Sequence, residues 1–367
     1  MKDLNSLKSL KNKVVILRTD YNVPIKGDKV VDLLRIEASY PTINLLLKKN
    51  ASIIILSHNG KDGAQSLMPV YKILSKKYDV LFSEDLPDKK PKLKPKQILL
   101  VDNIRKYKEE KEGSATFAKK IAALGDIYVN EAFPVSHRKH TSVYHLPKIM
   151  KSYPGIQLKK EIDHLGVLTN KAKSPFFVII GGAKFSTKLP LIKKFLKIAD
   201  YVFVGGALSN DLLKEAGFSV GKSLVEPGYD LKPLLKSTRL LLPSDLIVKR
   251  GSKILNVDIA DIGKNDVIID AGIDTTKALS MIVADSKTVL WNGPLGKYEE
   301  KGGKKATMKV LNALASNRKC FSVIGGGDIT AVSTKSIEEK LTFVSTGGGA
   351  ALEFLSKGSL PGIDVLK

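Results

Sequence analysis

The chain has 367 residues, more than a single hydrophobic core usually serves, so the length predicts two domains. Hydrophobic residues make up 43% and charged residues 26%, and no apolar run approaches the roughly 20 residues of a membrane span. The formal net charge is +23 but the basic residues are dispersed, which favours anionic substrates and a lysine-rich composition over a specific nucleic-acid partner.

In the first half, four apolar runs have the character of buried β-strands, and each ends in polar or charged residues. The stretches that follow these runs are Arg18 to Asn22, Ser57 to Lys61, Asp102 to Arg105, and Glu131 to Arg138. In an open parallel sheet the carboxyl ends of the strands share one edge, where ligands bind. Arginine side chains at that edge suit a small, highly charged anion, because a guanidinium holds phosphate or carboxylate through a fork of N–H donors.

In the second half, five strand-like runs end in glycine instead. The glycines that follow them are Gly181-Gly182, Gly205-Gly206, Gly293, Gly325-Gly326-Gly327 and Gly347-Gly348-Gly349. A glycine turn lets backbone N–H groups approach an anion closely. Five such turns on one sheet edge predict a nucleotide or polyphosphate site.

The most informative of these turns is Gly181 to Lys188, which follows the run Phe176 to Ile180. We expect a helix there with lysines at i and i+4, so that the positive helix end and two ammonium groups face one anion. The stretch is not a Walker A loop, because neither lysine is preceded by glycine. Taken alone, it is equally compatible with a glycine-rich turn carrying two solvated lysines.

Strand-like runs alternate with amphipathic helical stretches at 41–49, 115–123 and 188–197. This alternation predicts an α/β protein of two doubly wound parallel-sheet lobes joined by a hinge helix. Pro154-Gly155 and the helical stretch 157–168 form the expected connector. We therefore expect one lobe over 1–153, joined by the C-terminal segment 354–367, and a second lobe over 154–353.

Two other patterns resemble ligand sites but do not meet the requirements of those sites. Residues 216–223 nearly match a phosphate-binding loop, but the first glycine is one place late and a helix precedes it. His137 and His140 lack a third ligand at metal-binding spacing. The single cysteine, Cys320, excludes an internal disulfide, and with no secretory signal at the N-terminus it predicts a cytoplasmic protein.

Taken together, the order and spacing of these blocks resemble the phosphoglycerate kinase family from about residue 14 to residue 360. The matching blocks are Asp20-Tyr21-Asn22-Val23-Pro24, Ser57-His58 with Gly60, Tyr128-Val129-Asn130-Glu131-Ala132-Phe133 with His137-Arg138, Gly181-Gly182-Ala183-Lys184, Trp291-Asn292-Gly293-Pro294, Gly325-Gly326-Gly327-Asp328, and Ser345-Thr346-Gly347-Gly348-Gly349-Ala350. The resemblance implies a two-lobed cytoplasmic enzyme, expected to act as a monomer. Its reaction is reversible phosphoryl transfer between 1,3-bisphosphoglycerate and Mg-ADP, giving 3-phosphoglycerate and Mg-ATP.

The resemblance also assigns residues to the acid substrate in the first lobe. Asp20 and Asn22 would hold its hydroxyl and carboxyl end, and Arg35 would reach the transferring group. Its distal phosphate would meet His58, Lys61, Arg105 and Arg138. The neighbouring Tyr21, Asn59 and Gly60 belong to the same implied substrate site.

In the second lobe the resemblance implies a nucleotide site. Lys184 and Lys188 would meet the nucleotide phosphates, Glu299 the ribose, and Asp328 the Mg²⁺. The N–H groups around Gly348 would face the moving phosphoryl group. Further nucleotide contacts would come from Gly205, Gly206, Gly272, Asn292, Gly326, Gly327 and Ile329.

Several positions depart from the usual family pattern. Lys61 stands where the family usually has arginine and Pro134 where it has glycine. Glu131 replaces an aspartate, Thr187 replaces a frequent aspartate, and Ile329 replaces a hydroxyl residue. These changes leave two alternatives open: a kinase for a different small acid, and a basic nucleic-acid or scaffold protein that has lost catalysis.

Overall fold

The computed structural model describes residues 3–366 and separates the chain into two compact units. Unit 1 runs to Asp163 and takes in the segment from Ser359 onward, and unit 2 runs from His164 to Gly358. The boundaries expected from the sequence, after residues 153 and 353, remain a prediction about independently folding domains. No helix in the described part of the chain is both long enough and apolar enough to span a membrane.

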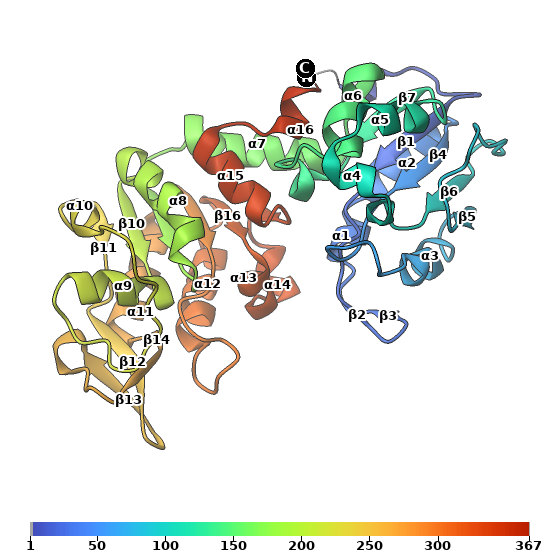
Figure 1. The fold of residues 1–367 in the computed structure, drawn as a ribbon. Helices are drawn as coiled ribbons and strands as arrows, with labels where there is room; N and C mark the ends of the chain where they lie inside the picture. Colours follow the sequence, from blue (N-terminus) through green and yellow to red (C-terminus); the bar gives the residue numbers. More distant parts are fainter. Residues whose placement is uncertain (1–2, 367) are drawn as a thin grey trace. The chain divides into compact units, whose positions relative to one another are not determined.

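Unit 1 is built on a six-stranded parallel sheet with the order β5-β6-β4-β1-β7-β8 (Figure 1). The strands are β5 Val80–Ser83, β6 Ile98–Val101, β4 Ser52–Leu56, β1 Val14–Arg18, β7 Ile127–Asn130 and β8 Ser152–Pro154. Their Ile, Val and Leu runs are buried because a parallel sheet is covered on both faces. Arg18 pairs with Leu56 on one side and with Asn130 on the other, so the ends of three strands lie level, and the polar residues that follow them start from the same edge.

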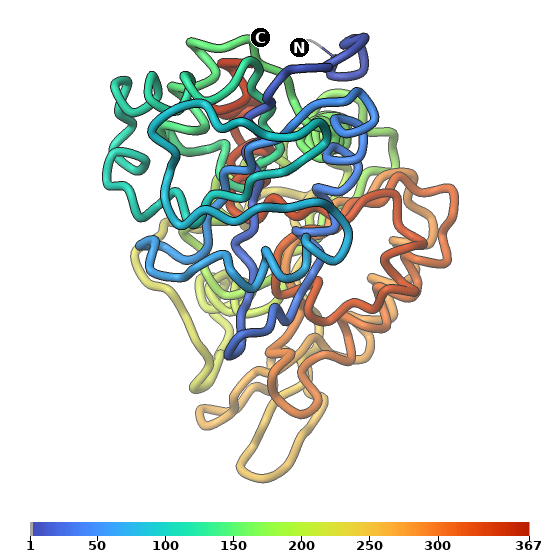
Figure 2. The backbone as a smooth tube through the Cα atoms, turned by 90° about the vertical axis from the view of Figure 1, so that its right-hand side faces the viewer, coloured from blue at the N-terminus to red at the C-terminus, as the bar shows by residue number. Residues whose placement is uncertain are grey.

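The helices of unit 1 are short. They are α1 Leu34–Glu37, α2 Tyr40–Lys48, α3 Met68–Leu74, α4 Lys108–Glu112, α5 Ala115–Ala122, α6 Leu146–Ile149 and α16 Pro361–Asp364. A hairpin of β2 Ile25–Lys26 and β3 Lys29–Val30, three 3₁₀ turns (Leu4–Ser6, Ile104–Lys106, Phe133–Val135) and a π-helical turn (η4 Thr141–His145) complete the unit. Figure 2 shows the red C-terminal segment, with α16, lying among the green and teal residues of unit 1. There the N–H of Gly362 donates to the carbonyl of Ser136 at 2.8 Å.

The helix α7, Ile156–Asn170, begins in unit 1 and ends in unit 2. Its first turn is capped by the buried carboxylate of Glu131, which accepts N–H bonds from Gln157 at 3.1 Å and Leu158 at 3.3 Å. Burial raises the pKa of Glu131 to about 7, although these bonds and one from the Thr42 hydroxyl oppose the shift. Gly155 is required here, because a Cβ would lie 1.9 Å from a Glu131 oxygen.

Unit 2 contains a second six-stranded parallel sheet, ordered β11-β10-β9-β15-β16-β17. The strands are β11 Leu240–Leu241, β10 Tyr201–Val204, β9 Phe176–Ile180, β15 Thr288–Asn292, β16 Phe321–Gly325 and β17 Phe343–Ser345. The five strands expected to end in glycine are therefore adjacent, and their ends share one edge. The fold of two parallel-sheet α/β lobes predicted from the sequence is confirmed.

Unit 2 also contains a small antiparallel sheet, β13-β12-β14, that the sequence analysis missed. Its strands are β12 Asp245–Arg250, β13 Lys253–Asp258 and β14 Val267–Ala271, and β12 and β13 form the yellow-orange hairpin at the bottom of Figures 1 and 2. One face packs on its own core, which includes Leu246 and Val248. Strand β13 is mostly exposed, so it lacks the continuous apolar run used to recognise the parallel strands.

The remaining helices of unit 2 lie between the strands or, in the case of α15, follow the last one. They are α8 Phe185–Ile198, α9 Ala207–Glu215, α10 Lys232–Leu235, α11 Ile273–Asp285, α12 Lys305–Ser316, α13 Gly327–Val332, α14 Lys335–Glu338 and α15 Gly349–Lys357, with a 3₁₀ turn at Ile259–Asp261. The expected helix at 188–197 thus begins three residues earlier, at Phe185. Lys184 is the residue before the helix, in an extended conformation, so only Lys188 lies within α8.

Candidate active site

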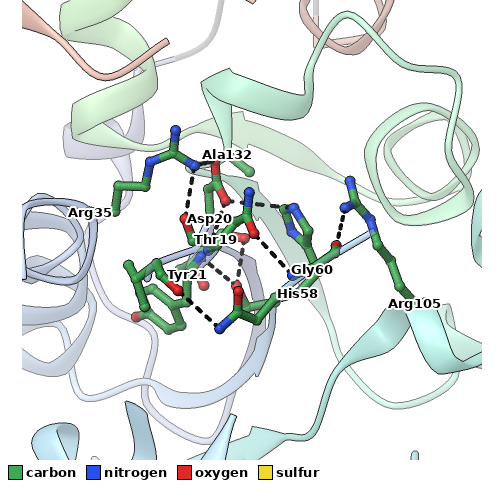
Figure 3. A network of polar contacts seen from close by, with 12 residues as sticks. Thr19, Asp20, Tyr21, Arg35, His58, Gly60, Arg105 and Ala132 are labelled. Atoms are coloured by element: carbon green, nitrogen blue, oxygen red, sulfur yellow. Dashed lines mark hydrogen bonds and ion pairs between the residues drawn. The ribbon is translucent and has the colours of Figure 1, made fainter. Parts of the chain in front are cut away.

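The ends of β1 and β4 bring together most of the substrate residues expected in unit 1 (Figure 3). Asp20 is central: one of its oxygens accepts from the guanidinium of Arg35 at 2.8 Å, and the other accepts from the N–H of Asn22 at 3.1 Å. The Asn22 side-chain oxygen accepts in turn from the N–H of Gly60 at 3.0 Å. The loops after the two strands are therefore tied together around one carboxylate.

His58 is buried within this cluster and is a neutral hydrogen-bonding group. Burial lowers its pKa well below the ordinary value, and the surrounding guanidinium groups of Arg18, Arg105, Arg35 and Arg138 lower it further. Its Nδ1 lies 3.3 Å from a nitrogen of Arg18, which can only donate, so the ring proton is on Nε2. Nε2 lies 3.7 Å from Asp20.

Arg18, at the end of β1, is a fully buried cation that the sequence analysis did not count among the site residues. Its Nε donates to the Ser142 hydroxyl at 2.7 Å, and its Nη2 lies 3.8 Å from the fully buried carboxylate of Glu110. Glu110 also accepts the N–H and hydroxyl of Ser142, yet burial still raises its pKa. The available signal was an arginine at the last position of an otherwise apolar strand.

Arg105 follows β6 and approaches the same cluster. Its Nη1 donates to the carbonyl of Gly60 at 2.6 Å, while its buried Nε has no hydrogen-bond partner within residues 3–366. Burial lowers its pKa to about 10, and repulsion from Arg18 and Arg138 adds to the shift. This crowding of cations against few carboxylates favours a bound anion.

The side chains of four expected residues of unit 1 are buried elsewhere or exposed, although Tyr21 belongs to the network of Figure 3 through its backbone. Tyr21 is buried with its hydroxyl 3.0 Å from that of Ser39, and the Asn59 amide donates inward to the carbonyl of Val23. The side chains of Lys61 and Arg138 are exposed, and Arg138 contacts only the neighbouring His137 among the hydrogen bonds of the described residues.

Unit 2 holds a cavity of about 350 Å³ against the glycine-bearing edge of its parallel sheet. Three expected residues line it, Gly206, Glu299 and Asp328. Burial raises the pKa of Tyr298, and the nearby carboxylates of Asp328 and Glu299 raise it further. The apolar wall, missed from the sequence, is formed by Leu224, Pro243, Leu246, Val267, Ile268, Ile269 and Leu295.

The glycine turns at this edge pack directly on one another. A Cβ at Gly181 would lie 2.1 Å from the carbonyl of Pro294, and one at Gly293 would lie 2.5 Å from the carbonyl of Gly181. Gly206 has φ +63°, and its Cβ would lie 2.7 Å from the nitrogen of Gly182. The close packing of three turns thus requires these glycines, whether or not the glycines also contact a ligand.

Other expected nucleotide residues lie outside the cavity lining. Gly272 is required by packing, since a Cβ there would lie 2.2 Å from the carboxyl carbon of Asp245. The Asn292 amide donates to the carbonyl of Gly325 at 2.7 Å, and the side chain of Ile329 is buried in the core. Also outside the lining are Gly205, Gly326, Gly327 and Gly348.

The two lysines of the glycine-lysine stretch differ in their surroundings. Lys184 is exposed, and Lys188 is half-buried. Burial lowers the pKa of Lys188 to about 8, while Asp328 opposes the shift. The helix end between them is already occupied, because a carboxylate oxygen of Glu226 accepts the N–H of Phe185 at 2.7 Å and that of Ser186 at 3.3 Å.

Comparisons with known proteins agree with these features. The family described as Phosphoglycerate kinase matches residues 2–358. The chain is 38% identical over 394 residues to the phosphoglycerate kinase of Finegoldia magna, covering 100% of this chain and 98% of the relative. That of Dictyoglomus turgidum is 37% identical over 381 residues, with 98% and 96% covered.

Solved structures give the same result. The structure of phosphoglycerate kinase from Coxiella burnetii matches with a TM-score of 0.88 and 34% identity, covering 100% of this chain and 98% of that one. The enzyme from Pyrococcus horikoshii matches with a TM-score of 0.84 and 25% identity over the same shares. The chain therefore belongs to the phosphoglycerate kinase family.

Proposed function

We propose that the chain performs its family's reaction in glycolysis, the reversible phosphoryl transfer between 1,3-bisphosphoglycerate and MgADP that gives 3-phosphoglycerate and MgATP. The observation that carries this proposal is the pairing of two different anion sites in one chain. Unit 1 presents guanidinium groups around Asp20, and unit 2 presents a partly apolar cavity beside glycine turns. The first suits a small phosphorylated acid and the second a nucleotide.

In unit 1, Asp20 and Asn22 hold the hydroxyl and carboxyl end of the acid. Neutral His58 donates a hydrogen bond from Nε2, and Arg105 offers its Nε N–H, which no atom of the described residues 3–366 accepts. Arg35, now paired with Asp20, is half-buried and reaches the transferring group. The exposed side chains of Lys61 and Arg138 hold the distal phosphate. Tyr21 and Asn59 support this surface from within, and Gly60 lies against it through its backbone.

In unit 2, the apolar wall of the cavity receives the purine ring and Glu299 the ribose. Lys184 and Lys188 meet the phosphates, with backbone groups of Gly326, Gly327 and Ile329 beside them. The N–H groups around Gly348 face the phosphoryl group in transfer. Gly205, Gly272 and Asn292 shape the pocket from behind.

Asp328 fits the role of a magnesium ligand. It lines the cavity near Glu299, and the described residues contain no group of three or more metal-binding side chains that would form a complete protein cage. Mg²⁺ is commonly held by one or two carboxylates together with substrate phosphates, so a single Asp328 is sufficient. The ion supplies charge neutralisation to the phosphates when bound.

Phosphoryl transfer to this acceptor requires that the substrates be positioned and that positive charge surround the transferring group, and it requires no general base. The acceptor is a carboxylate, which is already ionised at pH 7 because α-carboxyl pKa values lie near ~3.5. Arg35, Lys184 and the N–H groups near Gly348 stabilise the charge on the transferring phosphoryl. We propose that α7 acts as the hinge by which the lobes close and expel water. We further propose that the enzyme acts as a cytoplasmic monomer without a nucleic-acid partner.

A coupled assay with 3-phosphoglycerate, ATP and Mg²⁺ tests this proposal. We expect turnover that chelation of Mg²⁺ abolishes. Turnover only with another small acid would indicate a different acid kinase, and no turnover together with salt-sensitive RNA binding would indicate a non-catalytic basic protein. Either result would contradict the proposal.

The departure at Lys61 gives a quantitative expectation. Arginine can hold a phosphate through two parallel N–H bonds, whereas lysine acts as a point charge. The missing bond is worth ~1 kcal/mol, which corresponds to about fivefold in affinity. Because the contact is remote from the transferring group, Lys61→Arg should lower the KM for 3-phosphoglycerate about fivefold and leave kcat within about twofold.

Steady-state kinetics with each substrate varied measure this effect. Lys72→Arg, on α3 of the same unit, serves as a control for adding a guanidinium to unit 1. The KM for ATP should stay unchanged in both variants. A KM for 3-phosphoglycerate that stays constant or rises in Lys61→Arg would show that this side chain does not hold the phosphate.

A further inference from the structure

Glu226 occupies the place where the sequence alone suggests a bound phosphate. Its Oε2 accepts the N–H groups of Phe185 and Ser186, the first two residues of the 14-residue helix α8. A helix N-terminus carries a partial positive charge and free N–H donors, so an anion is stabilised there. This anion belongs to the protein itself and comes from a loop about 40 residues further along the chain.

The Glu226 carboxylate is held in turn by a supporting set of contacts. Its Oε1 accepts the hydroxyl of Tyr229 at 3.0 Å, and the Tyr229 ring lies 5.5 Å from the ring of Phe185. The Glu226 N–H donates to Asp211 of α9 at 2.7 Å. Phe185 is fully buried. These contacts fix the carboxylate against the helix end from two sides.

The same loop forms part of the nucleotide cavity. Lys222 and Leu224 line the cavity, as do Gly182 and Ala183 in the turn that leads to Lys184. Two segments thus line the cavity: the loop before Glu226 and the turn before α8. Glu226 connects them, because it follows the first and accepts hydrogen bonds from the helix that follows the second. Lys184 immediately precedes the two amides that Glu226 accepts, and Lys188 lies one turn into the helix.

We propose that Glu226 is a positioning residue for Lys184 and Lys188. By filling the positive end of α8, it fixes the first helical turn, on which the placement of both ammonium groups depends. It also keeps the amides of Phe185 and Ser186 from competing for the nucleotide phosphates. This inference rests on the proposed role of the two lysines in phosphoryl transfer.

Substitution of Glu226 tests the inference. Glu226→Ala and Glu226→Gln should speed hydrogen exchange at the amides of Phe185 and Ser186 at least tenfold. They should lower kcat about tenfold, because a small displacement of a catalytic charge weakens its interaction with the transition state. The KM for 3-phosphoglycerate should stay within about twofold, because that substrate binds to the other unit. Glu215→Gln, which removes the same charge at the end of α9, should change none of these quantities.

Tyr229→Phe provides a second route that keeps the aromatic packing. It should shift exchange and kcat in the same direction by a smaller factor, and it should have no further effect in a Glu226→Ala background, since Tyr229 acts through Glu226. This variant carries the test if Glu226→Ala does not fold. Unchanged exchange at the two amides, or faster exchange with kcat within twofold of wild type, would overturn the inference.

Failure of the proposed function can be recognised separately. If wild-type protein shows no turnover with 3-phosphoglycerate, calorimetric binding of ATP replaces kcat as the readout. Glu226→Ala should then weaken ATP binding several-fold while Glu215→Gln does not. Equal ATP affinity in wild type and Glu226→Ala would overturn the positioning role.

Discussion

Replacing Lys184 by alanine should nearly abolish kcat while leaving the dissociation constant for ADP within about tenfold. Lys184 is exposed and precedes α8, so its truncation removes no buried packing. The substitution should therefore remove the positive charge and leave the fold unchanged. Negative charge develops on the transferring phosphoryl oxygens, and an ammonium placed there contributes mainly in the transition state.

Stopped assays for kcat and calorimetry for ADP binding measure the two parts of this expectation. Lys193→Ala is a matched control, because it removes an exposed lysine from α8 itself. That variant should retain wild-type kcat. A Lys184→Ala enzyme with half the wild-type kcat would refute the catalytic role of Lys184.

Replacing Glu110 by alanine should destabilise the protein by about 3–5 kcal/mol. The carboxylate is fully buried and is the acidic group beside the fully buried guanidinium of Arg18. Its removal would leave the cation without a counter-charge and two donors of Ser142 without their acceptor. An uncompensated buried charge is among the largest penalties that a single substitution creates.

Urea denaturation followed by circular dichroism measures the change in the free energy of unfolding. Glu112→Ala, an exposed position on the same helix α4, should change that free energy by less than about 1 kcal/mol. The double variant Arg18→Met/Glu110→Leu should cost far less than Glu110→Ala alone, because it removes both charges together. Equal losses for Glu110→Ala and Glu112→Ala would contradict the charge-balancing role of Glu110.

The parallel sheets could be predicted because their signal is local. Each strand is a short apolar run, and the residue types that follow it, arginine and histidine in unit 1 or glycine in unit 2, are adjacent in sequence. The antiparallel sheet was missed because exposed strand β13 carries no such run. With it the apolar cavity wall at Leu246 and Ile268 was missed as well.

The site residues that escaped prediction depend on partners distant in sequence. Arg18 acquires its setting from Glu110 and Ser142, more than 90 residues away. The interpretation of the α8 end as a free phosphate site was incomplete for the same reason, since Glu226 fills it from outside the motif. Conversely, several glycines attributed to the ligand alone also serve the contact between turns, as at Gly181 and Gly206.

The return of α16 to unit 1 has a consequence for biosynthesis. Leu360 and Ile363 are buried, and the backbone bond from Gly362 to Ser136 attaches this segment to the amino-terminal half. A ribosome releases the chain from its amino end, so unit 2 is translated in full before the last piece of unit 1 emerges. The amino-terminal lobe, although made first, is therefore the one whose core is completed only after all of unit 2 has been translated.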